Sequence, residues 1–264
     1  MTEAIINGAR THYEREGSGL PVIFLHAGIA DLRMWEPQVA EFARHFDVIR
    51  VDHRGFGKSE LPPERWSDRA DLLALIDLLS LKPAHLVGCS MGGGLAIDFA
   101  LDHPDRVSRL VLVGPSIGGA NFGKKYPEVF AAVKAADQAG DMEAVNREEM
   151  YLFLDGPRRR RGHVRQPLRD LFLDMNGGNL DSNWETAPHD DLEPPAIERL
   201  HEITAETLVV VGDEDAPPIF DAVDVLLEKV PRAHKAVIHD AAHLPNLEHP
   251  AEFNQVVLEF LLQG

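Results

Sequence analysis

Residues 86–94 read Leu-Val-Gly-Cys-Ser-Met-Gly-Gly-Gly, and this stretch decides the fold. An apolar run over residues 84–87 ends at Gly88, Ser90 follows two positions later, and glycines resume at Gly92. Apolar residues then recur with helical spacing up to residue 100. The order predicts a buried strand, a sharp turn that carries Ser90, and a helix. Because a serine on so tight a turn needs neighbours without side chains, the glycines around it are expected on steric grounds.

The same residues match the pattern G-x-S-x-G, in which a serine hydroxyl stands above the N-terminus of a helix. The free backbone N–H groups of a helix N-terminus favour a developing negative charge. Glycine and serine are common residues, so this match is weak by itself. It gains weight only if a base, an acid and a second N–H donor are found elsewhere in the chain.

Length and charge limit the classes of protein that this chain can belong to. Its 264 residues suit one large domain, or a domain with an insertion. With 43 acidic and 26 basic residues, the net charge is −17, which argues against nucleic-acid binding, because phosphate contacts need clustered Lys and Arg. The four arginines at 158–161 are a local exception. We expect them to form a solvated face or loop rather than a ligand site.

Targeting signals are not evident in the sequence. The first residues include an acid and no apolar core, so we expect no signal peptide. No uninterrupted apolar stretch reaches the ~18 residues that a membrane span requires. The single cysteine excludes an internal disulfide. We therefore expect a cytoplasmic protein without membrane or nucleic-acid partners, and the sequence leaves open whether it is a monomer or a homodimer.

Predicted strands and helices alternate along the first part of the chain. Residues 3–13 predict a hairpin around Asn7-Gly8. Apolar runs predict further strands at 21–26, 48–51, 84–87 and 109–114, with helices at 35–46, at 71–81 and after Ser90. Because the strands are apolar throughout, they are expected to be buried on both faces. The alternation predicts an α/β fold, with a mostly parallel, twisted sheet and helices on both of its faces.

The alternation stops after Gly114. Residues 117–194 predict helices at 126–139, 142–153 and 166–175, and no convincing buried strand. Apolar strand patterns return at 207–212 and 235–238, and a last amphipathic helix begins at Pro250. We therefore expect a core made of residues 1–116 and 195–264, with residues 117–194 inserted as a helical cap.

Polar residues follow the two late apolar runs. Asp213, Glu214 and Asp215 come after the first run, and His243 comes shortly after the second. Ligands of open parallel sheets bind at the carboxyl ends of the strands, so these residues are expected near Ser90. A serine hydroxyl becomes a good nucleophile when a neutral imidazole takes its proton, and a carboxylate on the other ring nitrogen selects the tautomer. Any of the three acids could serve.

The chain resembles an α/β-hydrolase with a cap over nearly its whole length. Five stretches carry the resemblance, in the same order: residues 25–28 (LHAG), 52–59 (DHRGFGKS), 88–93 (GCSMGG), 212–215 (GDED) and 243–250 (HLPNLEHP). It is similar to 3-oxoadipate enol-lactonases, cofactor-free haloperoxidase/esterases and carbon–carbon bond hydrolases of aromatic-ring degradation. One departure is Ala27, where such proteins usually carry glycine. Alanine disfavours a positive φ there.

The resemblance implies a catalytic triad and an oxyanion hole. Ser90 would be the nucleophile, His243 the general base and acid, and Asp215 the orienting acid, because it occupies the third position after the glycine that ends its strand. The backbone N–H groups of Met91 and Gly28 would hold the oxyanion. No cofactor and no metal are implied.

We expect a serine hydrolase that cleaves a small-molecule ester or lactone through an acyl-enzyme. The same triad would also serve carbon–carbon bond hydrolysis or cofactor-free perhydrolysis and haloperoxidation, because a fold does not determine a reaction. A non-catalytic ligand receptor is a further alternative. Epoxide hydrolysis and dehalogenation are disfavoured, since similar proteins with those activities carry aspartate at position 90.

Several other residues have both a functional and a structural interpretation. Cys89 adjoins the serine, but a buried structural thiol is the simpler interpretation. His239 and His243 could bind zinc from one helix, but they follow a strand pattern and lack a third ligand. His26 is expected to brace the loop of Gly28. The candidate pocket residues, which could equally hold the core or the cap together, are His26, Trp35, Tyr151, Phe153 and Trp184, with Phe130 as a further cap aromatic.

Overall fold

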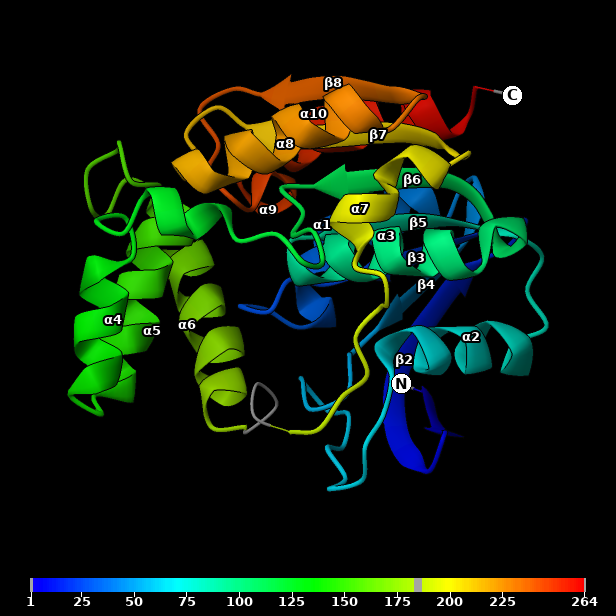
Figure 1. The fold of residues 1–264 in the computed structure, drawn as a ribbon, viewed down its shortest axis with the longest axis horizontal. Helices are drawn as coiled ribbons and strands as arrows, with labels where there is room; N and C mark the ends of the chain where they lie inside the picture. The colour runs from blue at the N-terminus through cyan, green and yellow to red at the C-terminus, as the bar shows by residue number, and fades with distance from the viewer. Residues whose placement is uncertain (1, 183–186, 264) are drawn as a thin grey trace.

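The computed structural model describes residues 2–182 and 187–263, and they form one eight-stranded sheet with helices around it (Figure 1). The spatial order of the strands is β1-β2-β4-β3-β5-β6-β7-β8. Strands β3 to β8 run parallel, and β2 joins β4 in antiparallel register. The strands are β1 (Thr2–Ile6), β2 (Ala9–Gly17), β3 (Leu20–Leu25), β4 (Phe46–Val51), β5 (Ala84–Cys89), β6 (Val107–Val113), β7 (Glu206–Gly212) and β8 (Ala233–Ile238).

Helices cover both faces of this sheet and gather beyond one end of it. The α-helices are α1 (Glu36–Phe42), α2 (Asp68–Leu78), α3 (Met91–Asp102), α4 (Ala131–Gln138), α5 (Met142–Met150), α6 (Gln166–Leu180), α7 (Ala196–Arg199), α8 (Pro217–Lys229), α9 (Pro245–Glu248) and α10 (Pro250–Leu261). The shorter helical turns are η1 (Leu32–Trp35), η2 (Pro104–Arg106), η3 (Phe122–Lys125), the π-type η4 (Tyr151–Asp155) and η6 (Leu200–Glu202).

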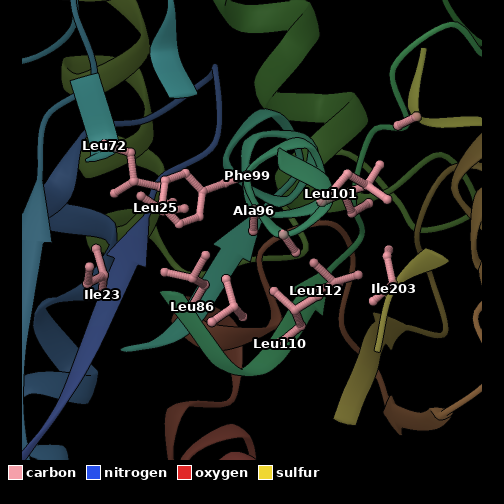
Figure 2. Close-up of a cluster of buried hydrophobic side chains, with 14 of the residues drawn as sticks. Ile23, Leu25, Leu72, Leu86, Ala96, Phe99, Leu101, Leu110, Leu112 and Ile203 are labelled. Atoms are coloured by element: carbon pink, nitrogen blue, oxygen red, sulfur yellow. The ribbon is translucent and has the colours of Figure 1, made fainter. Parts of the chain in front are cut away.

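Alternating side chains divide the core into two layers. In β3, Ile23 and Leu25 face the layer of α2, α3 and α8, whereas Val22 and Phe24 face the layer of α1 and α10. Figure 2 shows the first layer, where Leu72 of α2 and Phe99 of α3 pack over residues from several strands. The parallel strands are therefore apolar on both faces, as the uninterrupted apolar runs predict. The α/β fold predicted from the sequence is confirmed.

Helices α4, α5 and α6 lie together beyond the carboxyl ends of the strands, toward which the arrows in Figure 1 point. They belong to the segment between β6 and β7, and its described residues contribute no strand to the sheet. The long insertion therefore lies at the end of the sheet where ligands of parallel sheets bind. No helix among the described residues is both long enough and apolar enough to cross a membrane.

Some element boundaries differ from the sequence predictions. The hairpin at Asn7-Gly8 is confirmed, with Ile6 paired to Ala9. The helix expected at 35–46 is wrong at both ends: η1 and α1 share its first part, and Phe46 already belongs to β4. Phe46 leaves the helix because it pairs with Leu20 of β3 and packs its ring against Phe42. The helix expected at 142–153 is interrupted after Met150 by the wider turn η4.

Candidate active site

Ser90 sits on a strained turn between β5 and α3. Its φ of 52° and ψ of −111° lie where residues other than glycine are rarely found. A Cβ on Gly88 would lie 2.2 Å from the carbonyl oxygen of Gly92, and one on Gly92 would lie 2.3 Å from that of Leu25. The glycines of the motif are therefore required by close approach of backbones. The turn is fastened to β6 by the N–H of Ser90, 2.9 Å from the carbonyl oxygen of Val113.

Asp215 and His243 meet in the interior at the same edge of the sheet. Asp215 follows β7 and His243 follows β8, and each is 1% exposed. The Nδ1 atom of His243 lies 2.9 Å from Oδ2 and 3.2 Å from Oδ1 of Asp215. The carboxylate is oriented in turn by the N–H of Ala216, 2.7 Å from Oδ1. With a carboxylate on Nδ1, the neutral imidazole carries its proton there and offers Nε2 as the proton acceptor.

Gly114 links this pair to the serine turn. It follows Val113, whose carbonyl holds the N–H of Ser90. Gly114 has a φ of 47°, and a Cβ on it would lie 3.1 Å from Nδ1 of His243 and 3.2 Å from Oδ2 of Asp215. Asp215 and His243 therefore lie against the residue that follows the β6 partner of Ser90, at the edge where β5, β6, β7 and β8 end.

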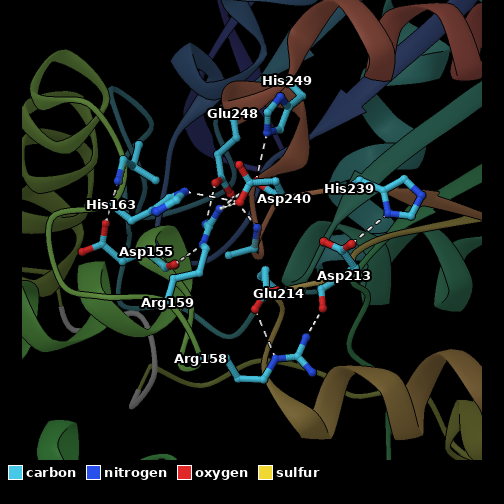
Figure 3. Close-up of polar contacts among 12 residues, drawn as sticks. Asp155, Arg158, Arg159, His163, Asp213, Glu214, His239, Asp240, Glu248 and His249 are labelled. Carbon is cyan, nitrogen blue, oxygen red and sulfur yellow. Dashed lines mark hydrogen bonds and ion pairs between the residues drawn. The ribbon is translucent and has the colours of Figure 1, made fainter.

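The other two acids after β7 are engaged elsewhere (Figure 3). Asp213 accepts a hydrogen bond from the exposed His239, with Nδ1 and Oδ2 2.8 Å apart. Glu214 pairs with Arg158, whose Nε lies 3.2 Å from Oε2. Of the three candidates, Asp215 is the one that faces His243. Among the described residues, no three His, Cys, Asp or Glu side chains gather as they would around a metal ion.

Met91 and Gly28 lie on two segments that touch. Met91 is the first residue of α3, so its N–H belongs to a helix N-terminus. Gly28 lies in the loop after β3, and this loop is fastened to the serine turn by the N–H of Gly92, 3.1 Å from the carbonyl oxygen of His26. Asn179 of α6 supports the loop from the other side, with Nδ2 2.9 Å from the carbonyl oxygen of Ala30. The loop path suits alanine, since Ala27 is not among the residues with positive φ.

His26 braces this loop from within. Its Nδ1 lies 2.8 Å from the carbonyl oxygen of Ala27, and its Nε2 accepts the N–H of His53 at 3.0 Å. The side chain is fully buried, and burial, with a smaller contribution from His53, holds the pKa of His26 well below its usual range. Both ring nitrogens are thus occupied in one neutral tautomer, so His26 acts as a support rather than a proton carrier.

The aromatic residues considered for a pocket take different positions. Phe153 stacks beside the imidazole of His243, with ring centroids 5.1 Å apart. Trp35 is fully buried between Phe24 and Phe253, so its place is in the core and the pocket prediction for it is wrong. Trp35 lies in the core because α1 and α10 cover that face of the sheet. Trp184 lies outside the described residues.

Two further cap aromatics lie away from the imidazole. The ring of Tyr151 is covered by the guanidinium groups of Arg161 and Arg169, at 4.1 and 5.4 Å, which is a packing contact within the insertion. Phe130 lines an open groove of about 670 Å³ between η3, α4 and α8.

Cys89 points into the core, with Sγ 3.7 Å from the carbonyl oxygen of His243. Burial, and to a lesser extent the charge of Asp215, raises the pKa of the Cys89 thiol. A neutral thiol is a poor nucleophile. The structural interpretation of this cysteine fits these surroundings.

A cavity of about 270 Å³ opens beside the serine turn. Met91 and Ser116 line it, and the hydroxyl and the N–H of Ser116 both donate to the carbonyl oxygen of Ser90, at 3.2 and 3.0 Å. Two polar atoms in its wall, Nε2 of His53 and Oδ1 of Asp98, are buried without a hydrogen-bond partner among the described residues. A buried polar atom that lacks a partner is costly, so these two atoms mark where a ligand group would be stabilised.

The charge around this cavity is predominantly negative. Its carboxylates belong to Asp68, Asp98, Asp190 and Asp191. Its two guanidinium groups are already paired: Arg54 holds Asp71 through two bonds of 2.8 and 2.9 Å, and Arg69 holds Asp102 at 2.9 Å. Sequence reasoning missed this cavity, because its wall comes from five separate stretches of chain.

Comparison with known proteins agrees with this geometry. A family model described as the alpha/beta hydrolase fold matches residues 21–250. The chain is 30% identical to a 2-hydroxymuconate semialdehyde hydrolase of Pseudomonas sp. (strain CF600), over 99% of this chain and 94% of that protein. It is 27% identical to a carboxylesterase of Bacillus subtilis (strain 168), over 92% of this chain and 80% of that protein.

A solved structure gives the same result. The enol-lactonase from Burkholderia xenovorans LB400 superimposes with a TM-score of 0.80 at 26% identity, and the match covers 99% of this chain and all of that one. The matched regions include the serine turn and the segments of Asp215 and His243. The chain therefore belongs to the family of proteins with the alpha/beta hydrolase fold.

Proposed function

We propose that this chain is a serine hydrolase that cleaves a small ester or lactone through an acyl-enzyme on Ser90. The observation that carries the proposal is the buried pair of Asp215 and His243, 2.9 Å apart, beside a serine held at a positive φ. Strain on a serine and burial of a carboxylate both cost stability, so their coincidence at one edge of the sheet favours a catalytic role.

The proposed mechanism begins when Oγ of Ser90 attacks the substrate carbonyl while Nε2 of His243 takes the hydroxyl proton. Asp215 stabilises the resulting imidazolium. The N–H groups of Met91 and Gly28 hold the negative oxygen of the tetrahedral intermediate. His243 then returns the proton to the leaving alcohol, and the acyl group stays on Ser90. Water repeats the sequence with the acyl-enzyme, which releases the acid and restores the hydroxyl.

Residues 117–194 are proposed as the cap over this site, and residues 1–116 and 195–264 as the core. Phe153 supports this division, since its carbonyl oxygen accepts the N–H of His243 at 3.0 Å. A cap so placed would limit the access of bulk water to the site, while the open groove or the cavity beside Met91 would admit the substrate and the water that hydrolyses the acyl-enzyme.

Carbon–carbon bond hydrolysis is the second candidate, because one relative is named for 2-hydroxymuconate semialdehyde, a carboxylate. The cavity beside Met91 argues for a different substrate. Four carboxylates line it, and one of them, that of Asp190, is paired with Arg65 at 2.9 Å. The two arginines of the wall are already paired, so an anionic substrate group would meet repulsion from the remaining carboxylates. Asp98 instead favours a hydroxyl or ammonium donor. We therefore propose neutral or cationic esters and lactones ahead of anionic diketones.

Labelling with a fluorophosphonate probe tests the nucleophile. The native chain should be labelled, and Ser90→Ala and His243→Ala should each lower turnover of an aryl ester by at least ~10⁴. Neither variant should be labelled at the native rate. If both variants are still labelled as fast as the native chain, the triad is excluded. A native chain that reacts with the probe, yet turns over none of the aryl esters, lactones and ring-cleavage diketones of a panel, would favour the receptor alternative.

Matched ester pairs test the substrate class. Esters with and without a carboxylate, on the acyl side and on the alcohol side, should differ in kcat/KM by at least about tenfold in favour of the neutral ester. Asp98→Asn should narrow that ratio while it leaves turnover of the neutral ester nearly unchanged. Equal ratios in the native chain and in Asp98→Asn would place substrate binding elsewhere.

A further inference from the structure

The arginine run at 158–161 does not behave as one solvated face. The side chains of Arg158 and Arg161 are 56% and 60% exposed, whereas that of Arg159 is 7% exposed. Arg161 stays within the insertion, where it pairs with Glu148. Arg159 turns the other way, toward the loop that carries His243 (Figure 3). The expected solvated face is therefore wrong for Arg159, although the run does lie in a loop.

Arg159 joins the insertion to this loop through its whole guanidinium group. Within its own segment it bonds the carbonyl oxygens of Leu154, at 2.8 Å, and Asp155. Across to the loop it donates to the carbonyl oxygen of Asp240 at 2.7 Å and to Oε2 of Glu248 at 2.6 Å. An arginine fork suits this task, because its planar donors can reach several acceptors at once.

Glu248 carries the connection to the residue beside the imidazole. Its side chain is 4% exposed, and its Oε1 accepts the N–H of Ala242 at 2.7 Å. The next N–H, that of His243, is held by the carbonyl oxygen of Phe153 at 3.0 Å. Two consecutive backbone N–H groups around the imidazole are thus held by the insertion, one directly and one through Glu248 and Arg159.

The approach of the two segments is close enough to require glycine at one point. Gly156 has a φ of 83°, and a Cβ on it would lie 2.7 Å from the carbonyl oxygen of Glu214 and 3.2 Å from Cβ of Ala242. Residues 153–159 therefore touch both the segment of the acid and the segment of the histidine. A shift of this segment would move both.

We propose that Arg159 and Glu248 are positioning residues that hold His243 in the geometry needed to deprotonate Ser90. The inference rests on the proposed function and names two residues that do not touch the substrate. Burial raises the pKa of Glu248 to about 7, and the main opposing effect is the guanidinium of Arg159. Without Arg159 the pKa of Glu248 would rise further, because the opposing positive charge is gone. A protonated Glu248 would be a weaker acceptor for the N–H of Ala242 than the carboxylate is.

Four variants test the proposal: Arg159→Met, Arg159→Lys, Glu248→Gln and, as the matched control, Arg161→Met. We expect Arg159→Met and Glu248→Gln to lower kcat by about ten- to a hundredfold, with KM changed by less than about twofold. Fluorophosphonate labelling of Ser90 should slow by the same factor. Arg159→Lys should recover part of the loss, since it restores the charge but not the fork. Arg161→Met should keep native kcat.

Coupling between the two residues is the sharper measurement. The double variant of Arg159→Met with Glu248→Gln should be no slower than the slower single variant, because both act through one connection. Glu248→Gln preserves size and serves the test if Arg159→Met fails to fold.

Three results would overturn the inference: folded variants with native kcat, a loss that Arg161→Met shares, or a fall in thermal midpoint alone. If Ser90→Ala also keeps activity, the proposed function itself is wrong; if Ser90→Ala is inactive, only the positioning role is wrong.

Discussion

The imidazole of His243 lies 2.9 Å from the carboxylate of Asp215 in the interior, while Asp213, two residues earlier, pairs with His239 at the surface at 2.8 Å. The same residue types thus form two acid–imidazole pairs from the same two segments. Burial distinguishes them, because the side chains of His243 and Asp215 are each 1% exposed, whereas those of His239 and Asp213 are 78% and 37% exposed. They offer a matched comparison within one protein.

We therefore expect Asp215→Asn to lower kcat by about 10⁴, since an amide no longer selects the required tautomer of His243. Asp213→Asn should keep kcat within about twofold. Steady-state kinetics on one aryl ester measures both. If Asp213→Asn loses activity and Asp215→Asn keeps it, the assignment of the acid is wrong.

Replacing two glycines by alanine should change the stability of the fold in opposite directions, because one glycine is closely packed and the other is not. Gly92→Ala should destabilise the fold by about 3 kcal/mol or more, because the new Cβ would lie 2.3 Å from the backbone oxygen of Leu25. At Gly178 of α6 a Cβ would meet no atom within 4 Å. Gly178→Ala should therefore stabilise by about 0.5 to 1 kcal/mol, through helix propensity. Urea unfolding compares them, and similar changes at both positions would contradict the packing argument.

The contribution of Asp98 to the free energy of unfolding should depend on pH. Burial raises its pKa from 3.8 to about 6, so between these values the folded state binds more protons than the unfolded state. Its contribution to stability therefore falls as pH rises from about 4 to about 6 and stays low above that. Asp98→Asn removes this loss and should stabilise by about 1 to 3 kcal/mol at pH 8, but by little at pH 4.

Asp224 supplies the control for this measurement, since it is an exposed carboxylate on α8. Asp224→Asn should change the free energy of unfolding by less than about 0.5 kcal/mol at both pH values. A gain from Asp98→Asn that does not vary with pH would contradict the burial of the Asp98 charge.

The thiol of Cys89 should react slowly with alkylating reagents in the folded protein. Because the side chain is fully buried and its pKa is raised, iodoacetamide should leave the native chain unmodified over hours and modify one site after unfolding. Cys89→Ala should keep kcat within a few-fold. Mass spectrometry counts the adducts, and rapid native modification with loss of activity would revive a thiol mechanism.

Much of the fold could be predicted from local pattern. The apolar runs identify strands that are buried on both faces, and Asn7-Gly8 identifies the hairpin, because strand periodicity and turn sterics are short-range properties. Helix α8 was not predicted, although the sequence carries two signals for it: Pro217 at its first position, and apolar residues at helical spacing such as Val223 and Leu226. Helix boundaries failed where a long-range pairing took over, as at Phe46, which β3 draws into the sheet.

The sequence by itself determined the serine turn, because glycines at 88 and 92 are demanded by backbone contacts that any such turn makes. It also determined the order in which an acid and a histidine follow. Only the tertiary structure decided which acid faces His243, that Trp35 is core, and that Arg159 reaches Glu248 while Arg161 does not. The two contacts that decide the acid and the role of Arg159 join residues 28 and 89 positions apart in the sequence. Neighbouring residues of the same type are distinguished only by the direction in which the packed backbone points them.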